Sequence, residues 1–449
     1  MHHHSLTEGS IWRSITLFAL PVFFGNLFQQ LYNAFDAWCV GNYIGDEALA
    51  AVSSSGSLIF MMVSFFNGLA MGAGVVIAQS YGAKRYGDMR KAIHTAIAFG
   101  LIAGIVLTVA GVALTPMILR WMGTPEDVLP RSIQYFRYYF CGAIFIVMYN
   151  IFVGILHAVG DSKHPLYYLI ISTGVNIVLD MLFVAVLGFD VGAAAIATTI
   201  SQGISATLCL VHMLRVDAPY QVHLRQIRID KHSLGQILRF GIPSGVQNSV
   251  ISIANVVVQA NINSFGKAAM AGCGSYSKLE GFAFLPVTCF SQALSTFVGQ
   301  NLGAGQHDRA KKGAAFGIIC SCLVAELIGI LSWIFAPQLI GLFSDSAVSI
   351  QLGAKHMRTI CLFYFLLAFS HCVAGVLRGA GKASVPMFTM LACWCVFRVC
   401  YISIAIELVP QLTTVSMAYP ITWSLSGIVF AIYFKIADPI QNFGRSPVC

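Results

Sequence analysis

A polar stripe crosses the otherwise apolar segment PVFFGNLFQQLYNAFD at residues 21–36. If residues 11–42 form one helix, Gln29, Asn33 and Asp36 follow one another at steps of four and three, so they share one face. A carboxylate at the centre of a bilayer costs roughly 3 kcal/mol on insertion scales. We therefore expect Asp36 to face a protein-lined or wet interior, where it can exchange a proton or hold a cation.

A second carboxylate follows in the segment NIVLD, where Asn176 and Asp180 lie one helical turn apart on one face. Carboxylate and amide oxygens suit a proton or a hard monovalent cation. We predict that Asp36, Asn176 and Asp180 form one ion site, with Na+ as the only metal expected there. The alternative is that Asp180 only hydrogen-bonds a helix end.

The first stretch also contains a predicted hinge. Pro21 removes one backbone hydrogen bond, and Gly25 follows one turn later, so the helix has a place to bend. The alternative is a static kink at Pro21.

The composition predicts an all-α polytopic membrane protein. Of 449 residues, 57% are hydrophobic and only 10% are charged, whereas about a quarter of the residues in soluble domains are charged. Twelve apolar stretches are long enough to cross about 30 Å of hydrocarbon. They lie at residues 11–42, 48–82, 93–118, 133–156, 166–188, 191–214, 237–264, 269–299, 313–341, 356–377, 386–408 and 414–436.

Basic residues set the predicted orientation. Most of the 26 Lys and Arg residues fall in the two termini and in the connections on the same side as the termini. The positive-inside rule then places both termini in the cytoplasm, with the protein in the plasma membrane. The net charge of +8 reflects this topology, so no nucleic-acid partner is expected.

The two halves of the chain repeat one design. FALPVFFGNLFQQLYNAF at residues 18–35 corresponds to FGIPSGVQNSVISIANVV at 240–257, and HAVGDSKHP at 157–165 corresponds to RGAGKASVP at 378–386. Six spans followed by six matching spans predict two lobes related by a pseudo-two-fold axis along the membrane normal.

The predicted organisation is therefore a first six-helix lobe at residues 1–214, a cytoplasmic linker at 215–236 and a second six-helix lobe at 237–449. Transporters of this architecture bind their substrates near the interface between the repeats. The predicted substrate cavity comprises Gln29, Asn33, Asn248, Asn255, Gln259 and Glu280.

The halves differ at the ionisable positions. Val258 replaces Asp36 in the second half, so the paired carboxylates are confined to the first. Glu280 is the acidic residue of the second half with a candidate role. A salt bridge from Glu280 to Lys278 or Arg398 is the favoured interpretation, because buried charges are usually paired. A contact with substrate is the alternative.

These features resemble the multidrug and toxic compound extrusion (MATE) family. The resemblance rests on the Pro-containing first helix with its late Asp, the QxxGA turns at residues 79–83 and 300–304, and the connections after each fourth helix. It covers essentially the whole chain. It implies an antiporter that exports amphipathic, often cationic compounds in exchange for inward H+ or Na+ flow, without a cofactor. We expect a monomer whose partners are small molecules and the lipid bilayer.

The resemblance also implies a fuller ion site. Family members with a first-lobe site use an Asp on the first helix, an Asn on the fourth, an Asn-x-x-x-Asp pair on the fifth and a Thr on the sixth. The matching residues here are Asp36, Asn150, Asn176, Asp180 and Thr198.

Two other functions compete with drug export. The first is a flippase or exporter of a lipid-linked or other amphipathic metabolite from the same superfamily, which would need a strongly basic cavity. The second is a membrane-embedded enzyme. The sequence contains no HExxH metal motif, no GxSxG turn and no Walker A loop, which argues against the enzyme.

Overall fold

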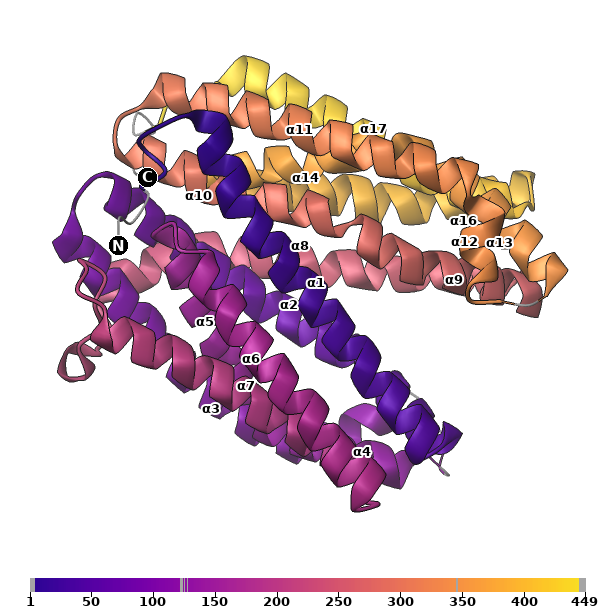
Figure 1. Ribbon diagram of the computed structural model, residues 1–449. Helices are drawn as coiled ribbons and strands as arrows, with labels where there is room; N and C mark the ends of the chain where they lie inside the picture. The colour runs from indigo at the N-terminus through magenta and orange to yellow at the C-terminus, as the bar shows by residue number, and fades with distance from the viewer. Residues whose placement is uncertain (1–4, 122–123, 125, 127, 345, 444–449) are drawn as a thin grey trace. The chain divides into compact units, whose positions relative to one another are not determined.

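Helices make up most of the chain that the computed structural model describes, residues 5–121, 124, 126, 128–344 and 346–443 (Figure 1). The side chains of residues 46–58, 60, 61 and 253 lie outside this description. Within it, no residue belongs to a β-strand. The all-α fold predicted from the sequence is confirmed.

The described residues form two compact units. The first unit comprises those of Phe24–Gly245, and the second comprises those of His4–Phe23 and Val246–Cys449. The predicted lobe bounds, at residues 214 and 237, stay a prediction.

The first unit contains six complete α-helices and one π-helical segment, together with parts of two long helices that both units share. They are α2 (Asp46–Gly82), α3 (Tyr86–Trp121), α4 (Leu129–Cys141), α5 (Ala143–Ala158), α6 (Lys163–Asp180), η1 (Met181–Val186) and α7 (Gly192–Arg215). The short 3-10 helix η2 (Leu224–Gln226) follows α7.

The second unit repeats this pattern with more interruptions. Its own elements are α9 (Lys267–Ala283), α10 (Leu285–Gly303), α11 (His307–Ile334), α12 (Ala336–Gly341), α13 (Ala347–Ile360), η3 (Cys361–Phe363), α14 (Tyr364–Gly379), α15 (Ser384–Met390), η4 (Leu391–Phe397), α16 (Arg398–Leu408) and α17 (Leu412–Ala437).

The two shared helices are α1 (Ile11–Tyr43) and α8 (Lys231–Asn263). Each is one unbroken α-helix with an internal proline, Pro21 in α1 and Pro243 in α8. Each passes from one unit to the other a few residues after its proline, because the boundaries fall at residues 23/24 and 245/246. Figure 1 shows α1 as a single long helix.

Small residues explain why the first part of α8 packs in the first unit. A Cβ atom added to Gly68 would overlap the backbone of Gly245, and one added to Gly72 would overlap the backbone of Gly241. Such glycines let two helix backbones approach closely, which is how helices associate in lipid.

Large apolar residues hold the first part of α1 in the second unit. Ile15, Phe18 and Val22 are at most 4% exposed and share one apolar cluster with Val298 and Leu302 of α10. The two shared helices therefore use different packing, close glycine contacts for α8 and interdigitating side chains for α1.

The membrane spans agree in place with eleven of the twelve spans predicted from the sequence, counting the bent pair α4 and α5 as one. Within the described residues, ten helices are long and apolar enough to cross a membrane, and α4 with α5 adds an eleventh if this pair is one span. The predicted span at residues 237–264 lies in α8, which is long enough but more polar.

Several predicted spans are interrupted, and two of them illustrate how. The span at residues 133–156 is divided between α4 and α5, which bend by 46° at Gly142. The span at residues 269–299 is divided between α9 and α10, and Pro286 lies in the first turn of α10. Proline is tolerated at that position because its missing N–H has no helical partner there.

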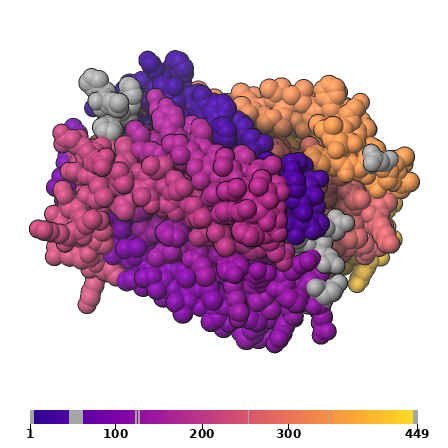
Figure 2. All heavy atoms as spheres, turned by 60° about the horizontal axis from the view of Figure 1, so that its bottom comes forward, coloured from indigo at the N-terminus to yellow at the C-terminus, as the bar shows by residue number. Residues whose placement is uncertain are grey.

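The first unit exposes apolar side chains on α6 and η1. Ile171 is 50% exposed, Val178 is 65% exposed and Val186 is 73% exposed. Figure 2 shows the side chains of the magenta segments that include these helices forming a continuous outer face. An extended apolar face is expected where lipid, rather than water, surrounds the protein.

Candidate functional site

Four polar residues from three helices meet in the first unit: Asp36 of α1, Asn176 and Asp180 of α6, and Thr198 of α7. With its amide nitrogen facing the carboxylates, Asn176 donates to Asp36 Oδ1 over 2.9 Å and to Asp180 Oδ2 over 3.3 Å. Thr198 Oγ1 donates to Asp36 Oδ2 over 3.2 Å. We call these four residues the carboxylate cluster.

The carboxylate cluster is largely enclosed. Asn176 and Asp180 are 0% exposed, Thr198 is buried and Asp36 is half-buried. The Asn176 amide nitrogen is within hydrogen-bond distance of both carboxylates, so the two acidic groups lie close together. The cluster can therefore hold one proton between two acids, or a cation in its place.

One acceptor in the carboxylate cluster lacks a partner. Asp180 Oδ1 is buried and accepts no hydrogen bond from the described part of the chain. An unsatisfied buried carboxylate oxygen is costly. A bound proton or cation at this atom would remove that cost.

The sequence of α6 explains how these residues point inward. Leu169, Thr173, Asn176 and Asp180 recur at steps of three and four, and all four are buried. Asp180 is the last residue of α6, and the π-helical segment η1 begins at the next residue. Short π-helical segments frequently occur at functional sites.

Tyr32 belongs to the surroundings of the carboxylate cluster, although it is absent from the site predicted from the sequence. It lies one turn before Asp36 on α1 and is 4% exposed. Its position could have been predicted from the sequence, because residues four apart in a helix share a face and Tyr32 lies four residues before Asp36. The buried rings of Tyr135 and Phe136 belong to the apolar cluster around Cys39 and Val40 of the same helix.

Asn150 is not joined to the carboxylate cluster by a recorded hydrogen bond. It is half-buried on α5, and its Nδ2 donates to Ile146 O of the same helix over 2.8 Å. Its role in ion binding, which came from the resemblance alone, stays a prediction.

The corresponding region of the second unit is apolar. Val258, which replaces Asp36, is 0% exposed and packs in a cluster with Ile262, Ile402 and Val415. Tyr401, which replaces Asp180, packs against the same cluster. Within the described residues, the first unit has an acidic pair, Asp36 and Asp180, and the corresponding positions of the second unit have none.

A buried arginine engages Asn255, one of the predicted cavity residues. Arg398 is 1% exposed; its Nη1 donates to Asn255 Oδ1 over 3.1 Å and its Nη2 donates to Thr422 Oγ1 over 3.0 Å. The guanidinium also lies 4.7 Å from the centre of the Tyr419 ring. Arg398 is therefore held by protein groups on several sides.

Four further predicted cavity residues lie along α1 and α8. Gln29 and Asn248 are half-buried, and Asn33 is exposed. Gln259 Nε2 donates to Asn263 Oδ1 over 2.8 Å. Their part in substrate binding stays a prediction.

Glu280 does not form the favoured salt bridge. Its Oε1 accepts a hydrogen bond from Tyr276 over 3.0 Å, and no ion pair within 4 Å is recorded for it in the described residues. Lys278 instead lies 5.3 Å from the ring centre of Phe343. Positions 278 and 280 are about 200° apart around a helix, so the side chains point to different faces.

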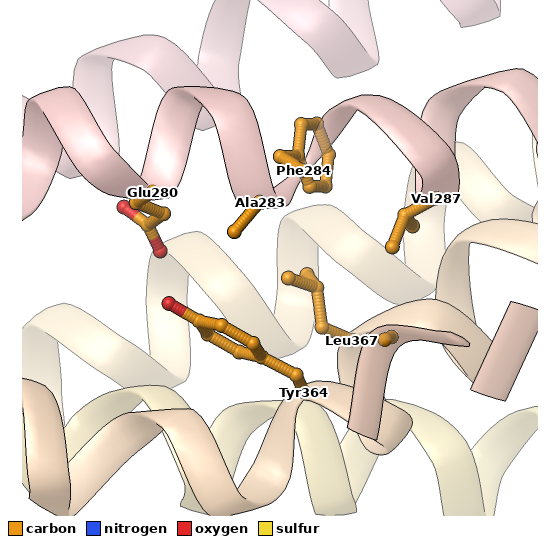
Figure 3. A pocket seen from close by; sticks show the side chains of 7 residues that line it. Glu280, Ala283, Phe284, Val287, Tyr364 and Leu367 are labelled. Atoms are coloured by element: carbon orange, nitrogen blue, oxygen red, sulfur yellow. The ribbon is translucent and has the colours of Figure 1, made fainter. Parts of the chain in front are cut away.

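Glu280 lines a narrow recess of the second unit with Phe284, Val287, Tyr364 and Leu367 (Figure 3). Figure 3 shows the carboxyl group of Glu280 and the hydroxyl group of Tyr364 facing one another. Tyr364 in turn donates to the hydroxyl group of Tyr276 over 3.3 Å. Glu280 is thus hydrogen-bonded to a tyrosine rather than to another carboxylate.

The contribution of Thr198 can be tested with its neighbour as a control. The Thr198 hydroxyl has one proton, which it divides between Asp36 Oδ2 and Ala194 O. A hydrogen bond to a charged group is worth roughly 1.5–3 kcal/mol, so we expect Thr198→Val to change the coupling-ion concentration for half-maximal transport by about tenfold. Thr199→Val, which affects a hydroxyl bonded to Tyr138 O, should change that concentration less than twofold. Equal effects of the two substitutions would show that Thr198 does not act on the ion.

Comparisons with known proteins agree with this geometry. The MatE family model matches residues 21–182 and 243–403, which are the two repeats. The "Probable multidrug resistance protein YoeA" of Bacillus subtilis is 30% identical over 396 residues, covering 86% of each chain. The "FAD transporter" of Shewanella oneidensis is 24% identical over 452 residues, covering 98% of each chain.

A solved structure shares the fold over nearly its whole length. It is described as the outward-facing conformation of a multidrug resistance MATE family transporter of the MOP superfamily. It aligns with a TM-score of 0.91 and 23% identity over 98% of both chains.

Proposed function

This chain belongs to the MatE family of multi-pass membrane transporters, and from that membership we propose that it exports amphipathic, cationic small molecules in exchange for H+ or Na+. Members of this family are transporters and not enzymes. Export of multiple drugs agrees with the name of the relative in Bacillus subtilis, a probable multidrug resistance protein.

The carboxylate cluster is the observation that supports ion coupling most directly. It provides two carboxylates, an amide and a hydroxyl inside an apolar bundle, and one carboxylate oxygen has no recorded partner. Oxygen donors of this kind suit H+ or Na+, and no further cofactor is proposed.

Coupling follows if ion and substrate prefer different states of the protein. An ion on Asp36 and Asp180 neutralises the carboxylates and lets α1 pack more tightly on α6 and α7, whereas the ionised pair favours water and a looser arrangement. Each ligand needs to prefer its state by only a few kcal/mol for one to displace the other. Export of a monovalent cation against an inside-negative potential costs about 2.3 kcal/mol per 100 mV, and exchange for one H+ or Na+ cancels that cost.

We further propose that Pro21 and Gly25 form the hinge of this change. The support is that α1 passes between the units at residues 23/24, between these two positions. The substrate is proposed to contact the polar residues of α1 and α8 and the acidic recess, namely Gln29, Asn33, Asn248, Asn255, Gln259 and Glu280.

The remaining proposals concern the setting of the protein. The distribution of Lys and Arg supports the plasma membrane with both termini cytoplasmic. We propose a monomer, because each compact unit has its own buried apolar core.

The function can be tested in proteoliposomes loaded with the cationic dye ethidium. A pH gradient and a Na+ gradient are imposed in separate experiments, and dye movement is followed by fluorescence. We expect one gradient to drive dye exchange at least tenfold above protein-free liposomes. Dye exchange at the rate of protein-free liposomes under both gradients would contradict the proposal.

Export of an amphipathic metabolite is the second candidate, and the relative from Shewanella oneidensis, named "FAD transporter", favours it. FAD is an anion, so a site for it would need an accessible positive charge. Arg398 is a buried basic residue at the start of α16. Because Arg398 is 1% exposed and is bound by Asn255 and Thr422, it offers little to an anionic cargo. FAD and a fluorescent anionic lipid, tested in the same liposomes, separate the two candidates.

A further inference from the structure

A second cluster of ionisable residues lies in the first unit, and ion coupling does not use it. It consists of Asp161, in the turn between α5 and α6, His164 in the first turn of α6, and His212 in the last turn of α7. One ligand atom from each residue lies within 4.8 Å of the other two. We call these residues the His–Asp cluster.

The geometry of the His–Asp cluster converges on one carboxylate oxygen. Asp161 Oδ2 lies 2.6 Å from His164 Nδ1 and 3.7 Å from His212 Nε2. The centres of the two imidazole rings are 4.1 Å apart, and the rings are inclined by 31°. The Asp161 and His212 side chains are 8% and 15% exposed, while that of His164 is 32% exposed and leaves a path to solvent.

Packing fixes these side chains in place. Asp161 Oδ1 accepts a hydrogen bond from the backbone N–H of His164 over 3.2 Å, so the carboxylate is tied to the start of α6. The His164 and His212 rings both lie beside the ring of Tyr168. The three ligand atoms are therefore held near one another before any ion arrives.

Two imidazole nitrogens and one carboxylate oxygen form a donor set typical of Zn2+. Tetrahedral bonds of about 2.0–2.2 Å place neighbouring ligand atoms roughly 3.3–3.6 Å apart. The distances of 2.6 and 3.7 Å lie on either side of that range, so small side-chain rotations suffice. Three protein ligands leave the fourth position for water.

The corresponding turn of the second unit shows that the fold does not require these residues. HAVGDSKHP is replaced there by RGAGKASVP, which puts Lys382 at the position of Asp161 and Val385 at that of His164. The turn itself is the same: Gly160 and Gly381 have φ of 91° and 73°, and the next residue donates a backbone hydrogen bond of 2.9 Å in the first unit and 2.8 Å in the second. The His–Asp cluster is thus an addition to a turn that forms without it.

We propose that Asp161, His164 and His212 bind a divalent transition-metal ion of the Zn2+ class. The bound ion would join the turn between α5 and α6 to the end of α7. It would thereby fix α6 against α7, the two helices that supply Asn176, Asp180 and Thr198 to the carboxylate cluster.

The test is Zn2+ titration of the purified full-length protein in detergent against a chromophoric chelator. All samples have His2, His3 and His4 replaced by Ser, because a run of three histidines binds metals by itself. This background protein should bind one Zn2+ tightly enough to compete with the chelator, and Zn2+ should raise its Tm. X-ray absorption should show only N and O ligands at about 2.0–2.2 Å.

Variants assign the binding to the His–Asp cluster. His212→Gln and Asp161→Asn should each weaken Zn2+ binding at least tenfold and abolish the rise in Tm, while His223→Gln, at an exposed histidine, should change neither. If His212→Gln does not fold, His164→Gln replaces it in the comparison. Absence of saturable binding in the background protein would overturn the proposal, as would equal affinity in the Asp161, His212 and His223 variants.

Discussion

Replacing Asp36 with Asn is expected to reduce gradient-driven ethidium exchange to the rate of protein-free liposomes. The substitution preserves the shape of the side chain and an acceptor oxygen for Asn176, and its new NH2 group can donate to Thr198 Oγ1, whose own proton then goes to Ala194 O. It removes the negative charge that a proton or Na+ neutralises. Without that charge the ion no longer selects one state of the protein, so coupling is lost. Asp180→Asn should have the same effect, because the two carboxyl groups act as a pair.

Asp190→Asn provides the matched control for loss of a carboxylate. Asp190 pairs with Arg131 over 3.6 Å, and its side chain is 43% exposed. Exposed pairs contribute about 0–1 kcal/mol, so this variant should fold and transport like the parent protein. Gel filtration and Tm in detergent should show all three variants folded. Exchange at the parent rate in Asp36→Asn would eliminate the carboxylate cluster as the coupling site.

Replacing Gly72 with Val is expected to prevent the first unit from assembling. The added Cβ would overlap the backbone of Gly241 and the carbonyl oxygen of Ile237, and neither can rotate away as a side chain could. Overpacking against side chains costs about 1–3 kcal/mol, so a clash between two backbones should cost more. The measurements are the yield of monodisperse protein and its Tm.

Gly174→Val is the control for this substitution. Gly174 also lies inside a helix, α6, but no atom lies within 4 Å of a Cβ placed there. This variant should be recovered in normal yield with a Tm close to that of the parent. Normal assembly of Gly72→Val would mean that α2 and α8 do not need their close approach.

The carboxylate cluster was predictable from the sequence because polar side chains in apolar membrane helices avoid lipid and face the protein interior. Contact with lipid is unfavourable for all three side chains, those of Asp36, Asn176 and Asp180, and one shared interior site keeps all of them away from it. The resemblance added Thr198, which the structure places against Asp36. Asn150 shows the limit of such prediction. An asparagine side chain can also make its hydrogen bond within its own helix, as Asn150 does with Ile146 O.

The arrangement of the second unit was less predictable. The expected partner of Glu280 was a basic residue, but a carboxyl group can also be satisfied by tyrosine hydroxyls, and residue type does not decide between them. Hydropathy located the twelve spans but not their interruptions, because the bend at Gly142 depends on how neighbouring helices pack.

The His–Asp cluster could not be predicted from the sequence, because no local motif joins its members. Asp161 and His164 lie at the start of α6, whereas His212 lies at the far end of the following helix, α7. The two histidines come together only because α6 and α7 pack against each other, and their spacing in the sequence does not predict that pairing.

The passage of α1 and α8 between the two units has a consequence for biosynthesis. A growing chain is made from its N-terminus, so Ile15, Phe18 and Val22 emerge long before Val298 and Leu302, the residues they pack against. The first unit likewise stays incomplete until Gly241 and Gly245 have been added. Neither half of the gene product, expressed alone as residues 1–230 or 231–449, should therefore reach a stable fold, whereas the two fragments produced together in one cell should complete each other.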